Sequence, residues 1–397
     1  MKKILIKEYK NTILNPKPPL HPKNSLNVDF VNGCKVEING NYETKYKVQF
    51  INQLNNDIVY EATISNNMWC KTNIRYFIDF IIKVEDLTTG KIAYEHIFNA
   101  KDKKVYIHLA SKALGDTLAW VPYLKEFKDK HKCELVVSTF HNKMFNTQYP
   151  DIKFVEPGTE IFGLYAMYEI GWHYQESGEV QWDCNPQDFK KYPLQQTATD
   201  VLGLEYTEIK PKTTFINKGS KIEGDYVCIA PHASAHAKYW MYPGGWQKII
   251  DYLRFKGYKV VIITQEPLND EWHDSKLGGT LKNVIDKTGD YSLSERANDL
   301  MNAKAFIGLG SGLSWLSWAV GCPTILISGF SEYYSEFKDC ERISPPSNKC
   351  KGCFNKYQLD AGDWEWCPEH KDTNRHFECT KSITPEIVIK AINNQLE

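Results

Sequence analysis

The chain has 397 residues, of which 42% are hydrophobic and 13% aromatic, and its formal net charge is -1. This length exceeds what one ordinary hydrophobic core organises, so it predicts two or three domains. The balance of 48 basic and 49 acidic side chains gives no electrostatic basis for nucleic acid or an anionic membrane as the main partner. We therefore expect any anionic ligand to be held by a local cluster of residues.

The sequence predicts neither a signal peptide nor a membrane span. Residues 1–8 carry charges and lack a sustained apolar run, so we predict no signal peptide. Residues 305–331 contain no charged side chain and have the composition of a membrane span, but glycines and Pro323 interrupt them. We predict strand, turn, helix, turn and strand inside a buried α/β domain, hence a soluble protein with no membrane span. We expect a cytoplasmic location.

The N-terminal part, residues 1–100, predicts a small antiparallel β domain. Residues 46–51, 58–64 and 76–84 alternate apolar and polar side chains and are rich in aromatic and β-branched types. Asn39-Gly40 and Thr89-Gly90 are candidate hairpin turns. We see no catalytic cluster here and expect a role in packing or partner contact.

The rest of the chain predicts an α/β fold with two Rossmann-like domains, residues 101–220 and 221–397. In the first, a strand at 105–109, a helical stretch over 118–127 and a strand at 134–138 form a βαβ unit, while 149–206 is irregular. In the second, strands at 226–230, 258–263, 305–308 and 324–327 alternate with helices at 245–254, 294–301 and 313–320. In such folds the ligand lies at the carboxyl ends of the strands.

The first candidate catalytic residue is Asp116, in the segment that follows the strand at 105–109. We expect Gly115 to let the backbone turn tightly and Asp116 to stand at the mouth of the helix, where a carboxylate can act as a general base toward a hydroxyl. The alternative is that Asp116 is only the N-cap of the helix. From these residues alone, the cap is the more common role.

A candidate anion site comes from two further loops that follow strands. Residues 231–240 form a loop of mostly small residues containing Lys238, whose ammonium could neutralise a departing diphosphate, although it could also be a solvated surface residue. Residues 308–315 place glycines between a strand and a helix, where backbone amides favour an anion, without the spacing of a P-loop. Together, Lys238 and the glycine loop at 308–315 predict a diphosphate site.

Four of the eleven cysteines concentrate in a segment at residues 345–380, here called the finger: Cys350, Cys353, Cys367 and Cys379. The short Cys-x-x-Cys knuckle, with Gly352 inside it, suits one tetrahedral metal centre, and sulfur ligands accept zinc or iron. Two disulfides are the alternative, and His370 or His376 could replace one cysteine. The other seven cysteines are scattered, as expected for buried thiols in a reducing compartment.

The combination of these motifs resembles a known family. Residues 113–119, 237–240 and 310–315 resemble the heptosyltransferases of lipopolysaccharide synthesis. With the finger included, the chain is more similar to the bacterial autotransporter heptosyltransferase family, over nearly its whole length. The resemblance implies a GT-B glycosyltransferase fold with an N-terminal β domain, ADP-heptose as donor, and Ser hydroxyls of autotransporter adhesins as acceptors, modified before export.

The resemblance also assigns roles to individual residues. The family's catalytic Asp falls on Asp116, its donor-phosphate Lys on Lys238, and its phosphate loop on Ser311, Gly312 and Leu313. Its iron ligands fall on the four finger cysteines, and its large rings, described as dodecamers, imply a homo-oligomer. The adenine and ribose contacts are positional guesses only, namely Gln265, Glu266, Thr288 and Gly289.

Two rival functions remain at this stage. One keeps the fold and changes the acceptor to the lipopolysaccharide core. The other is a non-catalytic scaffold, in which a GT-B body is a platform and the finger recruits partners; the intact Asp116, Lys238 and glycine loop argue against it. The enzyme hypothesis requires that Asp116 and the cationic, amide-rich loops open onto one shared gap.

Overall fold

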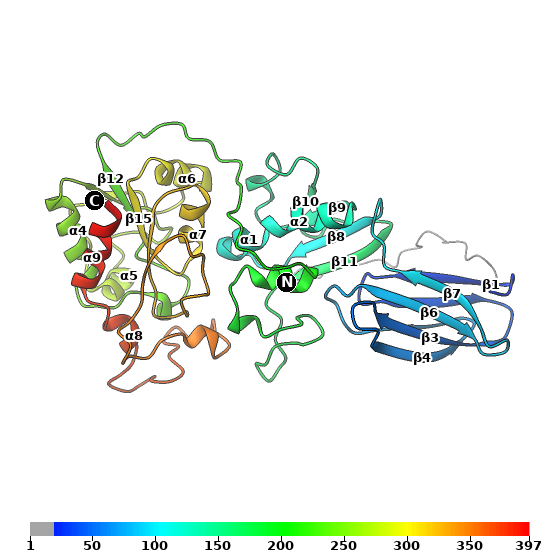
Figure 1. Ribbon diagram of the computed structural model, residues 1–397. Coiled ribbons are helices and arrows are strands. Elements are labelled where there is room, and N and C mark those ends of the chain that lie inside the picture. The colour runs from blue at the N-terminus through cyan, green and yellow to red at the C-terminus, as the bar shows by residue number, and fades with distance from the viewer. Residues whose placement is uncertain (1–19, 397) are drawn as a thin grey trace. The chain divides into compact units, whose positions relative to one another are not determined.

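The computed structural model describes residues 20–396, so the prediction about a signal peptide at residues 1–8 lies outside the described part. The described residues form two compact units, and Figure 1 labels their helices and strands. Among the described residues, the first unit comprises 20–112, Tyr123–Asp188 and Gln196–Thr207, and the second comprises Ala113–Pro122, Phe189–Gln195 and 208–396.

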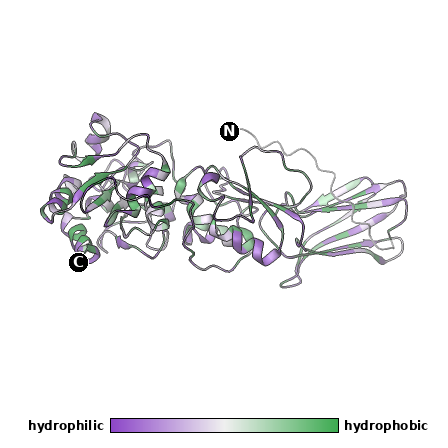
Figure 2. Cartoon of the chain, turned by 90° about the horizontal axis from the view of Figure 1, so that it is seen from above, coloured by the Kyte–Doolittle hydropathy of each residue, from purple (hydrophilic) through white to green (hydrophobic). Residues whose placement is uncertain are grey.

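The first unit begins with two antiparallel sheets. β1 (Asn24–Asp29), β2 (Lys35–Gly40) and β5 (Met68–Lys71) form one, and β4 (Ile58–Ser65), β3 (Lys45–Asn52), β6 (Phe80–Asp86) and β7 (Lys91–Ile97) form the other. Along β3 and β6, buried residues alternate with more exposed ones, and Figure 2 shows hydrophobic and hydrophilic colours alternating along strands of these sheets. The third predicted strand begins later than expected, at Phe80 instead of residue 76.

The two predicted hairpin turns have different outcomes. Thr89-Gly90 joins the paired strands β6 and β7, which confirms that prediction. The prediction for Asn39-Gly40 is wrong, because β2 ends there and pairs with β1 and β5, not with the following β3. Gly40 has φ 149° and lies directly opposite Asn24, where a side chain would collide with the neighbouring strand. The glycine therefore serves close strand approach.

The first unit also contains a parallel sheet in the order β10-β9-β8-β11. The predicted βαβ unit is confirmed by the parallel pairing of β8 (Lys104–Leu109) with β9 (Glu134–Ser138). The predicted helical stretch is two helices, α1 (Leu114–Trp120) and α2 (Pro122–His131), because Pro122 lacks the N–H that continuation requires. The region expected to be irregular contains β10 (Lys153–Val155), β11 (Leu164–Ile170) and α3 (Gln196–Leu202).

The second unit contains a six-stranded parallel sheet in the order β14-β13-β12-β15-β16-β17. The predicted strands correspond to β12 (Tyr226–Ile229), β13 (Lys259–Ile262), β15 (Ala305–Leu309) and β16 (Thr324–Ile327). Figure 1 shows α4 (Gly245–Phe255) and α9 (Pro385–Leu396) on one face of this sheet, and α6 (Leu293–Met301) and α7 (Gly312–Ala319) on the other. The sequence did not predict α5 (Glu271–Leu277), α9, or the edge strands β14 (Ile285–Asp286) and β17 (Glu341–Ile343).

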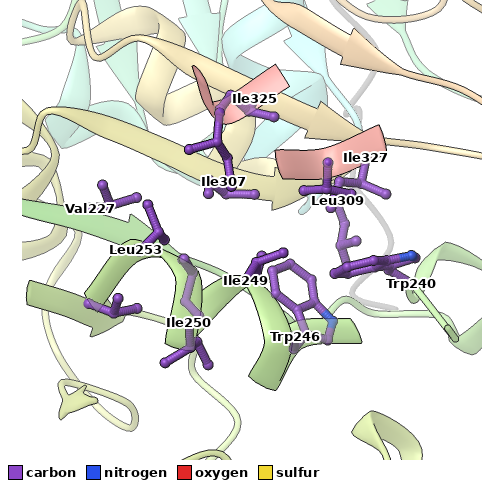
Figure 3. Close-up of a cluster of buried hydrophobic side chains, with 14 of the residues drawn as sticks. Val227, Trp240, Trp246, Ile249, Ile250, Leu253, Ile307, Leu309, Ile325 and Ile327 are labelled. Atoms are coloured by element: carbon purple, nitrogen blue, oxygen red, sulfur yellow. The ribbon is translucent and has the colours of Figure 1, made fainter. Parts of the chain in front are cut away.

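The core of the second unit lies between this sheet and α4. Trp246, Ile250 and Leu253 of α4 belong to one buried cluster with Ile307 and Ile325 of the sheet, and Figure 3 draws these side chains. Complete burial of such a side chain contributes about 1.5–3 kcal/mol to stability. Because helices cover both faces of a parallel sheet, its strands are apolar on both faces. The strands therefore hold the loops at their carboxyl ends in fixed positions.

The uncharged stretch at residues 305–331 is β15, α7, β16 and the loops between and after them, which confirms the predicted strand–helix–strand reading. All residues of β15 and β16 are buried. Between residues 20 and 396, no helix has both the length and the apolar character that crossing a bilayer requires.

Candidate functional site

Helices α1 and α7 pack closely in the second unit through two glycines. A Cβ on Gly115 would lie 3.0 Å from Cδ1 of Trp315, and a Cβ on Gly312 would lie 2.8 Å from Cβ of Leu114. Gly115 is the second residue of α1, so the expectation that it serves a tight turn is wrong. Its function is to let the two helices approach each other.

This contact fixes the position of Asp116. The N-cap of α1 is Ala113, which makes no side-chain capping hydrogen bond, so the alternative of Asp116 as N-cap is wrong. Asp116 instead occupies the first turn of α1 and is half-buried. A carboxylate in the first turn of a helix interacts favourably with the helix dipole.

The N-terminus of α7 has a different composition. Its N-cap is Ser311, which makes no side-chain capping bond, and no acidic residue lies in its first turn. The Oγ atom of Ser311 is buried and has no hydrogen-bond partner among residues 20–396. The amides of Gly312 and Leu313, at the first two helical positions, have no acceptor within the helix. This end of α7 therefore offers donors and a positive dipole end to an anion.

Lys238 is half-buried in the second unit, so the alternative of a solvated surface residue is wrong. It lies in the 3-10 turn η3 (His236–Lys238), and its ammonium is 5.4 Å from the centre of the Phe330 ring. Burial lowers the pKa of Lys238, while the negative charges of Asp116 and Glu336 oppose that shift. Asp116 and Lys238 are thus electrostatic neighbours within one compact unit.

A second carboxylate, Glu336, borders the glycine loop and was not predicted from the sequence. A Cβ on Gly310 would lie 2.7 Å from its Oε1 atom. Arg342 donates to its Oε2 at 2.5 Å, and the Ser331 hydroxyl donates to its Oε1 at 2.8 Å. Because the Glu336 and Arg342 side chains are only 9% and 12% exposed, this ion pair is a fixed part of the site.

The residues named for adenine and ribose contacts lie around one buried arginine. Arg296 donates to the carbonyl oxygens of Thr264 at 3.1 Å and Gly289 at 2.6 Å. The amide of Gly289 also bonds the carbonyls of Thr264 and Gln265, both at 3.2 Å. The structure therefore brings Gln265 and Gly289 together after β13 and β14.

The other two residues of that group, Glu266 and Thr288, have different neighbours. Glu266 lies near enough to Tyr239 to help raise the pKa of that phenol, although burial is the main cause. The backbone amide of Leu268 donates a hydrogen bond to the hydroxyl of Thr288 at 3.4 Å.

The finger contains all four predicted cysteines, and every cysteine of the chain is a free thiol in the structure. Gly352 has φ 71° and caps the 3-10 turn η4 (Cys353–Asn355), so the expected glycine turn in the knuckle is confirmed. A Cβ there would also lie 2.5 Å from Glu332 Oε1.

The sulfur atoms interact with one another electrostatically. A hydrogen bond with Cys379 lowers the pKa of Cys350. Burial raises the pKa of Cys353 to about 12, and the charges of Glu369, Cys350 and Cys367 add to this shift. A bound cation would reverse this effect, since it favours thiolates.

One group of three potential metal-binding atoms differs from the predicted set of four sulfurs. One ligand atom each from Cys350, Glu369 and His370 lie within 4.8 Å of one another. His370 was one of the two histidines considered as a replacement ligand. The other, His376, has its Nε2 atom 3.2 Å from the carbonyl oxygen of Glu365. Glu369 was not predicted.

Comparison with known proteins decides the family. A model described as glycosyltransferase family 9 (heptosyltransferase) matches residues 170–345. The autotransporter heptosyltransferase BAHTCr of Citrobacter rodentium is 34% identical over 92% of this chain and 88% of its own length. The chain belongs to the autotransporter heptosyltransferase family. It is a glycosyltransferase.

Other members of the autotransporter heptosyltransferase family show how far the likeness extends. TibC of Escherichia coli O78:H11 is 34% identical over 92% of this chain and 88% of its own. The crystal structure of TibC, described as an iron-containing dodecameric glycosyltransferase, has a TM-score of 0.84 and covers 97% of this chain and 98% of its own at 32% identity. A second TibC structure, with the same TM-score and coverage at 31% identity, contains ADP-D-beta-D-heptose.

The family also includes a protein named as inactive. BimC of Burkholderia thailandensis, an inactive autotransporter heptosyltransferase, is 29% identical over 92% of this chain and 85% of its own length. Residue-level chemistry in a family member therefore has to be argued from its own site.

Proposed function

We propose that this member of the family is a protein O-heptosyltransferase with the GT-B arrangement of two Rossmann-like domains. It transfers heptose from ADP-heptose to Ser hydroxyls of an autotransporter adhesin in the cytoplasm, with inversion at the anomeric carbon. The observation that carries this proposal is the proximity of Asp116, Lys238 and the N-terminus of α7 within one compact unit.

The donor diphosphate would bind at Lys238 and the first turn of α7. The Lys238 ammonium supplies one positive charge, and the amides of Gly312 and Leu313 and the hydroxyl of Ser311 supply hydrogen-bond donors. These donors are fixed before the reaction, so they stabilise the charge that develops on the leaving group. The binding of ADP-heptose by TibC supports the same donor here.

The acceptor would be activated by Asp116. Its carboxylate accepts the proton of the Ser hydroxyl while the Ser oxygen attacks the anomeric carbon and the bond from that carbon to the diphosphate oxygen breaks. ADP leaves with the electron pair of that bond, and the single displacement inverts the anomeric configuration. General base catalysis of this type contributes about 10²–10⁴-fold to the rate.

Iron is the proposed resident metal of the finger. The four thiols at Cys350, Cys353, Cys367 and Cys379 are a donor set that suits iron or zinc, and the iron in TibC favours iron. The proximity of Glu369 and His370 to Cys350 adds oxygen and nitrogen donors to the choice. Bound metal would cross-link the finger and stabilise its fold.

We also propose that the chain assembles into a homo-oligomer, as the dodecameric TibC does.

The domain division predicted from the sequence, at residues 1–100, 101–220 and 221–397, stays part of the proposed function. The first Rossmann-like domain would then serve the acceptor and the second the nucleotide sugar.

Co-expression with an autotransporter adhesin passenger tests the function directly. Mass spectrometry of the passenger is expected to show added heptose on Ser residues, and only when the ADP-heptose pathway is intact. Purified enzyme given ADP-heptose and lipopolysaccharide core instead distinguishes the rival acceptor. Transfer of heptose to neither acceptor, with ADP still bound, would favour the non-catalytic scaffold.

A further inference from the structure

Consecutive residues of the turn that carries Lys238 contact the finger or its core. The ring of His236 stacks on Trp364, with centroids 5.4 Å apart and planes at 8°, and its Nδ1 atom lies 3.1 Å from Glu365 Oε1. Ala237 and Phe330, the ring under the Lys238 ammonium, belong to one buried cluster. The other members of this cluster come from the finger, namely Cys353, Trp366, Cys367 and Phe377.

The turn itself has little internal stabilisation. η3 (His236–Lys238) is a single 3-10 turn, and its N-cap, Ala235, makes no side-chain hydrogen bond. Short 3-10 turns have poor hydrogen-bond geometry, so their conformation depends on surrounding contacts. Here those contacts come largely from the finger, on one side of a turn whose last residue is Lys238.

We infer that the finger is the support of the donor site and that Glu365 is a positioning residue. Through His236, Glu365 fixes the η3 turn so that the Lys238 ammonium meets the donor diphosphate. Lys276 lies 3.8 Å from the Glu365 carboxylate and His376 is 3.2 Å from its carbonyl, so Glu365 itself is held from two sides. This inference rests on the proposed donor site at Lys238.

A double-mutant cycle on ADP binding tests the inference with the full chain. Isothermal titration calorimetry would give the Kd for ADP of the unaltered protein, Glu365→Ala, Lys238→Ala and the double variant. Loss of the charge-assisted contact is expected to weaken ADP binding about threefold to tenfold. In the Lys238→Ala background the same change should have no further effect, because Glu365 acts only through Lys238.

Further variants separate positioning from damage to the finger. Lys371→Ala removes an ion pair with Asp363 in the same segment and should leave the Kd unchanged. Glu365→Gln keeps an acceptor oxygen for His236 and should restore most of the affinity. Phe330→Leu keeps apolar volume but removes the ring under the ammonium, and should weaken ADP binding only when Lys238 is present. Metal content per chain is measured for every variant and should stay constant.

The outcomes distinguish this inference from the proposed function. An unchanged Kd in Glu365→Ala, or an equal loss in the Lys238→Ala background, would overturn the positioning role and leave the donor site intact. If Lys238→Ala itself binds ADP as the unaltered protein does, the donor-site assignment fails, and the inference fails with it.

Discussion

Two helices with the same local construction have opposite electrostatic character. α1 and α7 each follow a strand of a parallel sheet, β8 and β15, after a short loop, and neither N-cap makes a side-chain hydrogen bond. α1 carries Asp116 in its first turn, whereas the first turn of α7 has no acidic residue. The positive end of α1 is therefore compensated by its own carboxylate, and that of α7 is open to an anion.

The two helix ends therefore suit different parts of a transfer reaction. A carboxylate can accept a proton from a hydroxyl, and backbone amides at a helix N-terminus can hold a leaving diphosphate. The contact of Gly115 and Gly312 brings the two helix ends together, and Lys238 lies near Asp116 as well. The predictions below test each side of this comparison, from the largest expected effect to the smallest.

Asp116→Asn should remove the proposed general base on α1 and preserve the proposed diphosphate site at the N-terminus of α7. The amide keeps the shape of the side chain but cannot accept the acceptor proton, so single-turnover transfer should slow about 10²–10⁴-fold. The Kd for ADP should change little. Asp129→Asn, at an exposed ion pair with Lys125 on α2, is the matched control and should keep full activity. Transfer by Asp116→Asn within a few-fold of the unaltered enzyme would remove the base assignment.

Ser311→Asp should place a carboxylate at the N-cap of α7, which has no acidic residue in its first turn. Aspartate is a favourable N-cap, so the folded state should remain stable. Its charge would repel the diphosphate and weaken ADP binding by about 1–3 kcal/mol, which is roughly tenfold to a hundredfold. Ser311→Asn is the neutral control. Equal Kd values for the two variants, measured by calorimetry, would show that no anion binds at this helix end.

The pH dependence of ADP binding should report on Lys238. Only the protonated ammonium attracts the diphosphate, and the pKa of Lys238 is lowered, so affinity should fall as the pH rises through that pKa. Lys238→Arg should abolish this alkaline loss, because guanidinium stays charged. Asp116→Asn should move the loss to lower pH, since it removes a negative charge that raises the Lys238 pKa. An unmoved alkaline limb would contradict their proximity.

The two glycines at the helix contact should differ in their tolerance of a methyl group. A Cβ on Gly312 would meet Leu114 Cβ at 2.8 Å, so Gly312→Ala should destabilise the fold by about 1–2 kcal/mol. A Cβ on Gly115 would meet Trp315 at 3.0 Å, and the gain of about 1 kcal/mol in helix propensity offsets part of that strain. Urea unfolding of both variants measures the difference. Equal destabilisation would mean that the contact is not set by these glycines.

Much of the second unit could be predicted from the sequence because its strands are short, apolar and bounded by glycine, proline or polar residues. Residues 324–327 were predicted with their observed bounds, and 245–254 within one residue. The edge strands β14 and β17 have two and three residues and leave no readable period. The helical stretch at 118–127 was predicted as one helix because its apolar positions continue across the break before Pro122.

The residues of the candidate site also fall into those that the sequence predicted and those that only the structure reveals. Asp116, Lys238 and Ser311 could be singled out because each lies in a short segment that follows a strand of a parallel sheet. Glu336 lies in the connection between β16 and β17 with no motif around it, and only the tertiary approach of its carboxylate to Gly310 reveals it. The contact of Glu365 with His236 joins residues 129 positions apart, which no local pattern encodes.

A crystal structure of the full chain with bound ADP is the most direct test of the central claim, that Lys238 and the open end of α7 form one diphosphate site beside Asp116. The account predicts diphosphate oxygens within hydrogen-bond distance of Lys238 Nζ and of the amides of Gly312 and Leu313. A diphosphate bound elsewhere, with no contact to Lys238 or to α7, would contradict it.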